Sequence, residues 1–287
     1  MEIQTEGSLR HKEKTVVVTL TDAGYFSRAK RTIIDIRSRG EWTGDIVLIT
    51  VGFDASRNFL DYYNVTQKRV EHISTDNLVK QYSQFPLKTI GDNRHILKLY
   101  QWDKFYVFDD WFKQWNKVIF LDAGLRVFDK ISILDSIPCD GKILAPDDAA
   151  PYDIDKRFKL MMELTANPLV TEELFKEYSK DILDGRYFLN CIWVYDTSLL
   201  DSCNMMEEMI VTMNTYPICR CNEMTIMNLL FTFKYKVWQP FPEFISSKGL
   251  EKRLFGWIEY DRDYGPNRTW RDFCFMKYPC SINMDCE

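Results

Sequence analysis

The first fifty residues constrain the fold of this chain more than any other stretch, because they alternate between two apolar patterns. Residues 14–20, KTVVVTL, form a β-branched run that is typical of a buried strand. An amphipathic stretch over residues 23–39 predicts a helix, and residues 44–52, GDIVLITVG, predict a second buried strand. A crossover of this length is what parallel pairing requires. We therefore expect an α/β fold with a Rossmann-like, mostly parallel central sheet that helices cover on both faces.

The rest of the chain continues the alternation of strands and helices. A long helix is predicted from Asn93 to Trp115, and a later helix carries a core stripe from Leu199 to Met213. The last forty residues show no regular pattern. Further strands are predicted at residues 70–73, 118–121 and 142–148, and residues 185–200 are predicted as a buried strand that runs into the later helix. A helix is predicted at 221–233, and a late strand or extended segment at 235–244.

Composition limits the kinds of protein this chain can be. Its 287 residues, 46% of them hydrophobic, suit one large globular domain, and no repeat or low-complexity linker divides them. The 37 basic and 42 acidic residues give a net charge of -5, so we expect no nucleic-acid partner. No apolar window is long enough for a membrane span and no signal peptide begins the chain, so we expect a cytoplasmic protein. The eight cysteines form no C-x-x-C pair, and because we see no signal peptide we expect reduced thiols.

The stretch VIFLDAGLRVF, residues 118–128, places a single carboxylate, Asp122, at the end of a buried strand. In open α/β sheets, ligands bind beyond the carboxyl ends of the strands, because loops and helix N-termini converge there. Asp122 is therefore a candidate ligand-binding residue, although a plain D-A-G turn explains these three letters equally well. Other predicted strands also end in polar side chains, namely Thr19, Thr21, Asp147, Asp148 and Asn190.

Two common nucleotide-binding devices are absent from the sequence. The turn after the first strand, TLTDAGYFSRA, lacks the G-x-G-x-x-G pattern of dinucleotide-binding folds, and no P-loop occurs. A bound anion must then be neutralised by a divalent cation held on carboxylates, or by Lys or Arg. Asp122 suits the first device, because Mg²⁺ and Mn²⁺ prefer hard oxygen ligands and often bridge a carboxylate to a diphosphate.

Taken in order, these segments resemble the GT-A glycosyltransferases, and specifically the glycogenin-like group of nucleotide-sugar transferases. The resemblance spans roughly residues 14–240 and lies more in the order of the blocks than in any one motif. The blocks are VVVTLTDAGYFSRAKRTIIDIRS, ILKLYQWDKF with KVIFLDAGLRVF, LAPDD, YFLNCIWVYDTSLL and CNEMTIMNLLF. The implied activity is transfer of a sugar from a nucleotide donor, most often a UDP-sugar, to a hydroxyl of a carbohydrate or glycoconjugate. The resemblance also implies a nucleotide-binding half, residues 14–125, and a sugar- and acceptor-binding half, residues 126–287.

The resemblance assigns roles to individual residues of the donor site. Asp122 matches the first acid of the D-x-D metal motif, and Ala123 and Gly124 occupy its second and third positions. Lys98 matches a helix lysine aimed at the diphosphate. A solvated helix face explains Lys98 equally well. Tyr25 matches a stacking partner for uracil. The expected contacts to the base and ribose are Thr19, Leu20 and Thr21.

The later blocks supply the residues expected around the reacting sugar. Asp147 and Asp148 match the position that holds hydroxyls of the donor sugar, and Asn190 matches an asparagine that approaches that sugar. Asn222 and Glu223 fall where the family carries an acidic or amide pair beside the anomeric carbon. Each of these residues could equally be an ordinary strand-end or helix-cap group.

Two departures from the family bear on the metal. Gly124 stands where the second acid of D-x-D is expected, which removes one carboxylate ligand from a Mn²⁺ or Mg²⁺ ion. A late histidine ligand has no match either, because His11, His72 and His95 all precede the motif. Metal dependence is therefore an open question of this sequence. Compensating charge could come from basic residues, namely Lys98, Arg126, Lys248, Lys252 or Arg268.

The sequence is compatible with more than one kind of chemistry. An inverting enzyme needs a carboxylate base, for which Asp147, Asp148 and Glu223 are candidates, whereas a retaining enzyme needs none on the acceptor side. Gly124 and the missing histidine also fit a catalytically weak relative that binds a nucleotide or glycan. A sugar nucleotidyltransferase shares the sheet but needs a Gly-rich basic loop after the first strand, and TDAGYFSRAKR has one glycine.

Overall fold

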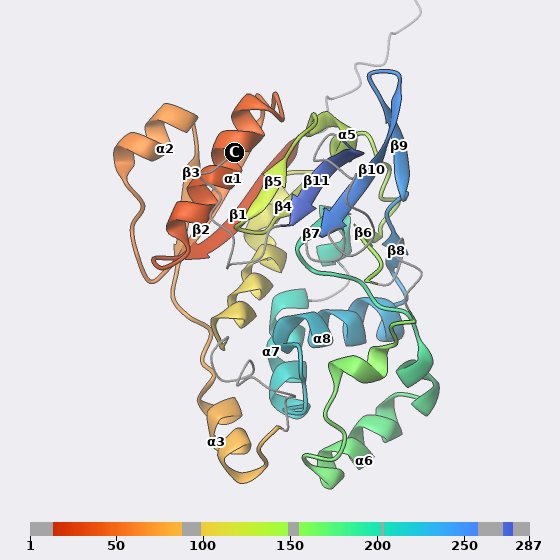
Figure 1. Ribbon diagram of the computed structural model, residues 1–287. Coiled ribbons are helices and arrows are strands. Elements are labelled where there is room, and N and C mark those ends of the chain that lie inside the picture. Colours follow the sequence, from red (N-terminus) through yellow and green to blue (C-terminus); the bar gives the residue numbers. More distant parts are fainter. Residues whose placement is uncertain (1–13, 88–98, 149–154, 202–203, 258–271, 278–287) are drawn as a thin grey trace, which may run out of the picture.

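A computed structural model of the protein describes residues 14–87, 99–148, 155–201, 204–257 and 272–277. Its centre is a seven-stranded sheet in the order β3-β2-β1-β4-β7-β6-β8 (Figure 1). The strands of this sheet, in chain order, are β1 (Thr15–Asp22), β2 (Asp45–Val51), β3 (Thr66–Val70), β4 (Lys117–Leu121), β6 (Ile143–Ala145), β7 (Ile192–Asp196) and β8 (Trp238–Pro240).

The sheet is parallel in its first half and mixed in its second. Strands β3, β2, β1 and β4 run parallel to one another, as the βαβ pattern of the first fifty residues predicts. Strand β7 runs antiparallel to both β4 and β6, and β6 pairs in parallel with β8. The third strand lies at Thr66–Val70, slightly earlier than the predicted residues 70–73. The expected α/β architecture with a mostly parallel sheet is confirmed.

The central strands are buried on both faces, because their apolar side chains alternate between two cores. In β4, Val118 and Phe120 belong to one core, and Ile119 and Leu121 belong to the other. Helix α1 (Phe26–Ser38) covers one face, and the helices between residues 76 and 114 together with those of the second half of the chain cover the other (Figure 1). This arrangement explains why these strands appear in the sequence as continuous hydrophobic runs.

A second, four-stranded sheet lies over the same face as α1, in the order β5-β11-β10-β9. Its strands are β5 (Leu125–Val127), β9 (Phe244–Ser247), β10 (Leu250–Trp257) and β11 (Phe273–Lys277). The last forty residues show no regular pattern in the sequence, yet the structure has β10 and β11 there. The pattern of β10, LEKRLFGW, does not alternate, and β11 pairs with β5, which is distant in the chain, as well as with β10.

The helices differ from the predictions most clearly in the middle of the chain. The predicted α-helix from Asn93 to Trp115 is, over its described part, two 3-10 helices that break at Asp109, whose carboxylate accepts a hydrogen bond from Trp111 N at 2.7 Å. The helix predicted from Leu199 begins later, at Met205. The helices are α1, α2 (Arg57–Tyr63), α3 (Asp76–Gln84), η1 (Leu99–Phe108), η2 (Asp110–Gln114), α5 (Ser132–Asp135), η3 (Phe158–Met161), α6 (Pro168–Glu177), η4 (Lys180–Asp184), η5 (Thr197–Asp201), α7 (Met205–Thr215), α8 (Asn222–Asn228) and the π-helical η6 (Leu229–Lys234).

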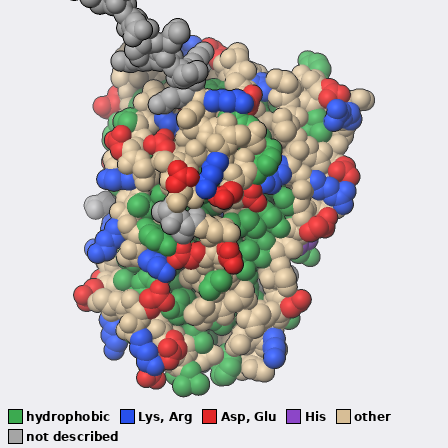
Figure 2. Space-filling model, turned by 180° about the vertical axis from the view of Figure 1, so that it is seen from behind, with side chains coloured by type: hydrophobic (Ala, Val, Ile, Leu, Met, Phe, Trp, Pro, Cys, Tyr) green, Lys and Arg blue, Asp and Glu red, His purple; other side chains and the backbone are tan. Residues whose placement is uncertain are grey.

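The surface of the described part gives two further facts. None of its helices has the length and apolar character needed to cross a membrane. On the face seen in Figure 2, basic and acidic side chains are interspersed among hydrophobic ones.

Candidate functional site

The carboxyl end of β4 turns sharply and presents Asp122 at the edge of the central sheet. Asp122 N donates to Cys191 O at 2.9 Å, which ties this turn to the segment that leads into β7. Leu125 N donates to Asp122 O at 2.9 Å and closes the turn before β5. The Asp122 side chain is 20% exposed. The predicted position of this carboxylate, directly after a buried strand, is therefore where the structure has it.

Two ammonium groups contact the Asp122 carboxylate. Lys104 Nζ, from η1, lies 3.6 Å from Oδ1. Lys277 Nζ, from the end of β11, binds Oδ2 and also donates to Ala123 O at 3.0 Å. Burial by itself would raise the pKa of Asp122, but the two lysines outweigh it and hold that pKa below its ordinary value. Asp122 is therefore an ionised carboxylate paired with two cations.

Lys104 joins Asp122 to two further candidates, Asn190 and Glu223. Its ammonium lies 3.1 Å from Glu223 Oε1 and donates to Asn190 O at 3.3 Å. Asn190 Nδ2 in turn donates to Glu223 Oε1 at 2.9 Å. All three side chains are buried. The structure thus brings together, at one edge of the sheet, polar residues from η1, β4, the start of β7 and α8.

The electrostatics of this group are set by burial. Burial raises the pKa of Glu223, and contacts with Lys104 and Asn190 only partly oppose that rise. Burial by itself would lower the pKa of Lys104, but Asp122 and Glu223 outweigh it, so its pKa lies above the ordinary value and the ammonium keeps its charge. Glu223 Oε2 is buried and has no hydrogen-bond partner within the part of the chain that the structure describes. This carboxylate oxygen can therefore accept a hydrogen bond from a hydroxyl group.

Among the described residues, the lysines that contact Asp122 are Lys104 and Lys277, and the sequence pointed to neither of them. Lys98 lies outside the described residues, as do His11, His95 and Arg268. Arg126 is fully buried and pairs with Asp35, with 2.5 Å between Nε and Oδ2. Lys252 pairs with Asp129 at 2.9 Å, and neither contact reaches Asp122. Lys104 stands six residues after Lys98 in the same block, so the only available signal was that this block carries two lysines.

Gly124 adopts a backbone conformation that favours glycine, with φ at +93°. A Cβ at this position would lie 2.7 Å from both Nε and Nη2 of Arg28, which reaches over the turn from α1. Gly124 N donates to Thr32 Oγ1 at 3.2 Å, also on α1. The group that approaches this glycine closely is therefore a guanidinium of the same chain.

The carboxyl end of β1 carries the residues expected to contact the nucleotide. Thr19 and Thr21 are buried. Leu20 is partly buried and packs against the core on the face of the sheet that α1 does not cover. Thr19 Oγ1 has no hydrogen-bond partner among the described residues, and Thr21 Oγ1 donates to Asp22 O at 2.8 Å. Tyr25 is 44% exposed at the N-terminus of α1, and its backbone N donates to Asp22 Oδ1 at 2.8 Å. An exposed ring at this edge is compatible with base stacking.

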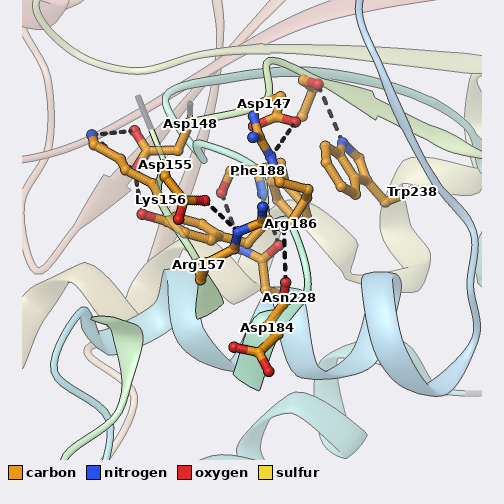
Figure 3. Close-up of polar contacts among 12 residues, drawn as sticks. Asp147, Asp148, Asp155, Lys156, Arg157, Asp184, Arg186, Phe188, Asn228 and Trp238 are labelled. Atoms are coloured by element: carbon orange, nitrogen blue, oxygen red, sulfur yellow. Dashed lines mark hydrogen bonds and ion pairs between the residues drawn. The ribbon is translucent and has the colours of Figure 1, made fainter. Parts of the chain in front are cut away.

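Asp147 and Asp148 lie just beyond β6 and are held by neighbouring basic and hydroxyl groups (Figure 3). Arg186 binds Asp147 with both ends of its guanidinium, at 2.7 and 3.1 Å. Lys156 Nζ lies 3.1 Å from each oxygen of Asp148, which also accepts from the Tyr187 hydroxyl. Burial raises the pKa of Asp148, although Lys156 and Tyr187 oppose the rise. The segment that carries Arg186 and Tyr187 continues to Asn190, which connects this cluster along the chain to the Asp122 group.

The residues around Asp122 do not fit a divalent cation well. Within the described ranges, no three His, Cys, Asp or Glu side chains gather in a way that could hold a metal ion. The Asp122 carboxylate already binds two ammonium groups, and His72 pairs with Asp103 at 2.7 Å. A metal at this turn would have one carboxylate ligand and two cationic neighbours.

Comparisons with known proteins identify the fold. No protein-family model matches the chain, and no curated protein matches it in sequence. Solved structures do match, and among them the galactosyltransferase LgtC, in complex with donor and acceptor sugar analogues, aligns with a TM-score of 0.56 at 12% identity over 92% of this chain and 86% of that one. An active-site mutant of LgtC gives 0.60 at 13% identity, covering 94% and 90%. Core-mannan synthase A (Ktr4) from Aspergillus fumigatus, in a Mn/GDP form, gives 0.52 at 8% identity, covering 82% and 74%. The expected GT-A fold is confirmed.

Proposed function

We propose that the protein is a glycosyltransferase that moves a sugar from a nucleotide-sugar donor to a hydroxyl of a carbohydrate or glycoconjugate acceptor. The observation that carries the proposal is the convergence of Asp122, Lys104, Asn190 and Glu223 at the carboxyl edge of a GT-A sheet. Ligands bind at this edge in open α/β folds. Similar folds have been solved as a galactosyltransferase with donor and acceptor analogues and as a mannan synthase with GDP, which supports sugar transfer from a nucleotide donor.

The proposal assigns the donor to the strand ends of the first half of the chain. The base and ribose lie against Thr19, Leu20 and Thr21, with the exposed Tyr25 ring as the stacking partner, and the diphosphate lies at Asp122 and Gly124. We propose a UDP-sugar as the donor, and a GDP-sugar is the competing choice because Ktr4 was solved with GDP. Residues 14–125 then form the nucleotide-binding half of a single domain, and residues 126–287 form the sugar- and acceptor-binding half.

The chemistry of sugar transfer matches the charges found at the site. Positive charge develops at the anomeric carbon while negative charge grows on the leaving diphosphate, so catalysis requires stabilisation of both. Glu223 and Asn190 are proposed to face the reacting sugar, because a buried carboxylate with one unpaired oxygen can accept from a sugar hydroxyl. Asp147 and Asp148 are proposed to hold other sugar hydroxyls.

A donor screen tests this function. Thermal unfolding is measured with UDP, GDP and a panel of their sugar conjugates, because a ligand that binds only the folded state raises the melting temperature. We expect one nucleotide family to stabilise the protein and its sugar conjugate to be slowly hydrolysed without acceptor. Asp122→Ala should abolish turnover while the folded structure, measured by circular dichroism, is retained. Wild-type turnover in that variant would show that the site is assigned wrongly, and tight binding without hydrolysis across the panel would favour a binding protein.

A further inference from the structure

We propose that the ammonium group of Lys277 takes the place of a divalent cation on Asp122 and neutralises the donor diphosphate, so that the site works without a metal. This inference rests on the proposed function, because it concerns the same nucleotide-sugar site. A structure of similar fold has been solved in a Mn/GDP form, whereas the turn at Asp122 offers one carboxylate to a metal. The proposal explains this difference.

The position of Lys277 carries the first part of the argument. Its Nζ bridges a carboxylate oxygen of Asp122 and the backbone oxygen of Ala123, which are the kind of hard oxygen atoms that Mg²⁺ or Mn²⁺ would use. The side chain is 13% exposed. A cation is thus already bound at this turn, and it belongs to the protein.

The backbone around Lys277 shows that this placement is built into the fold. Lys277 is the last residue of β11, and it pairs with Leu125 in the antiparallel ladder between β11 and β5. Leu125 directly follows the turn that carries Asp122 and Gly124. The ladder therefore fixes the lysine opposite the turn, and only the side-chain rotamer remains to be set.

Gly124 and Arg28 carry the second part. The second acid of a D-x-D motif would need a side chain at position 124, where a Cβ meets the Arg28 guanidinium at 2.7 Å and φ is +93°. The turn is therefore shaped for a glycine under a cationic side chain, and not for a second carboxylate.

The balance of charge follows from these contacts. Lys104 and Lys277 bring two ammonium groups to the turn, and Asp122 and Glu223 bring two carboxylates. Because both ammonium groups lie against Asp122, their charge attracts a diphosphate and opposes the approach of a divalent cation to that carboxylate. The pKa of Lys104 lies above its ordinary value because of Asp122 and Glu223, so its ammonium keeps its charge at neutral pH.

The transfer step can proceed with these groups. The bond from the anomeric carbon to the diphosphate oxygen breaks with both electrons on the diphosphate, while the acceptor oxygen bonds to the anomeric carbon and passes its proton to the leaving diphosphate. Lys277 donates hydrogen bonds to the oxygens on which this negative charge grows. No oxidant, reductant or further reactant is needed.

The test measures binding of UDP and GDP by titration calorimetry, once in EDTA and once with MnCl₂. We expect the wild-type affinity for the nucleotide that binds to be equal, within about twofold, under the two conditions. Lys277→Gln should weaken binding roughly tenfold to a hundredfold in both, the usual range for one charge-assisted hydrogen bond to a phosphate, and Lys277→Arg should weaken it less. Lys130→Gln is the matched control, because Lys130 is an exposed lysine paired with Glu41, and its substitution should leave affinity unchanged.

A second readout does not depend on nucleotide or activity. Binding of Mn²⁺ to the protein alone, followed by electron paramagnetic resonance, should show no stoichiometric site at Asp122, so the wild type and Asp122→Ala should give the same spectra. A nucleotide affinity that requires MnCl₂, or bound Mn²⁺ that Asp122→Ala removes, would overturn the inference and leave the proposed function standing. Absence of UDP and GDP binding under both conditions would overturn the proposed function, and the inference with it.

Discussion

Replacing Lys104 by Met removes the buried ammonium that links Asp122 and Glu223. At 3.1 Å from Glu223 Oε1 and 3.6 Å from Asp122 Oδ1, each attraction amounts to about 5 kcal/mol at an effective dielectric constant of about 20. Most of this gain offsets the cost of burying the charges, so the net loss is smaller. Breaking a buried pair by removing one partner typically costs about 3–5 kcal/mol, because the remaining charge stays buried without compensation.

This loss is large enough to measure by thermal or urea unfolding. The entropy of unfolding is about 2.1 cal/mol/K per residue, or about 0.6 kcal/mol/K for this chain, so the melting temperature should fall by about 5–8 °C at pH 7. Lys113→Met is the matched control, because Lys113 forms exposed ion pairs with Asp110 and Asp201. Its substitution should have an effect close to the limit of measurement.

The dependence of this loss on pH identifies its cause. Burial already raises the pKa of Glu223, and without Lys104 that pKa should rise further. A carboxyl group with a raised pKa in the folded state binds its proton more tightly there than in the unfolded chain, so stability falls as pH rises from the unfolded to the folded pKa. The loss in Lys104→Met should therefore be larger at pH 8 than at pH 5, and Lys104→Met with Glu223→Gln should remove most of that difference. A loss below about 1 kcal/mol, or an equal loss at both pH values, would refute the reasoning.

Three further predictions follow from buried or strained groups elsewhere. Asp35→Asn removes the carboxylate that lies 2.5 Å from the buried Arg126 guanidinium and should lower the free energy of unfolding by about 3–5 kcal/mol. The double substitution Asp35→Leu with Arg126→Leu should cost much less, and equal losses in urea titrations would contradict this. Gly124→Ala forces a Cβ to within 2.7 Å of Arg28 at a φ of +93° and should cost about 1–3 kcal/mol by the same measurement, and a neutral effect would argue against this turn. Burial raises the pKa of Asp148, so the wild type should gain stability relative to Asp148→Asn as pH falls from 7 towards 4. The midpoints of urea unfolding measure this difference, and a difference that shrinks or stays constant would show that the pKa is not raised.

The arrangement of cations at Asp122 shows where prediction from sequence ended. The sequence named Asp122, Asn190 and Glu223 as candidates, and the structure brings these three together around Lys104. It named Lys98 from the resemblance, and Lys98 lies outside the described residues, whereas Lys104, six positions later, was not singled out. The described part of that segment is a 3-10 helix, in which side chains recur every three residues, so the side chains that face the sheet differ from those of an α-helix.

The sequence by itself determined the central architecture and the place of the carboxylate. Strand and helix periodicities are local properties, and a strand-helix-strand unit permits essentially one parallel crossover, so β1, α1, β2 and the end of β4 were predictable. The tertiary structure alone decided the partners of Asp122. Lys277 lies 155 positions away from it, on a strand that forms only through pairing with β5 and β10. Contacts of this kind depend on which distant segments pair and in which register. The sequence pattern of a single segment predicts neither its pairing partner nor the register.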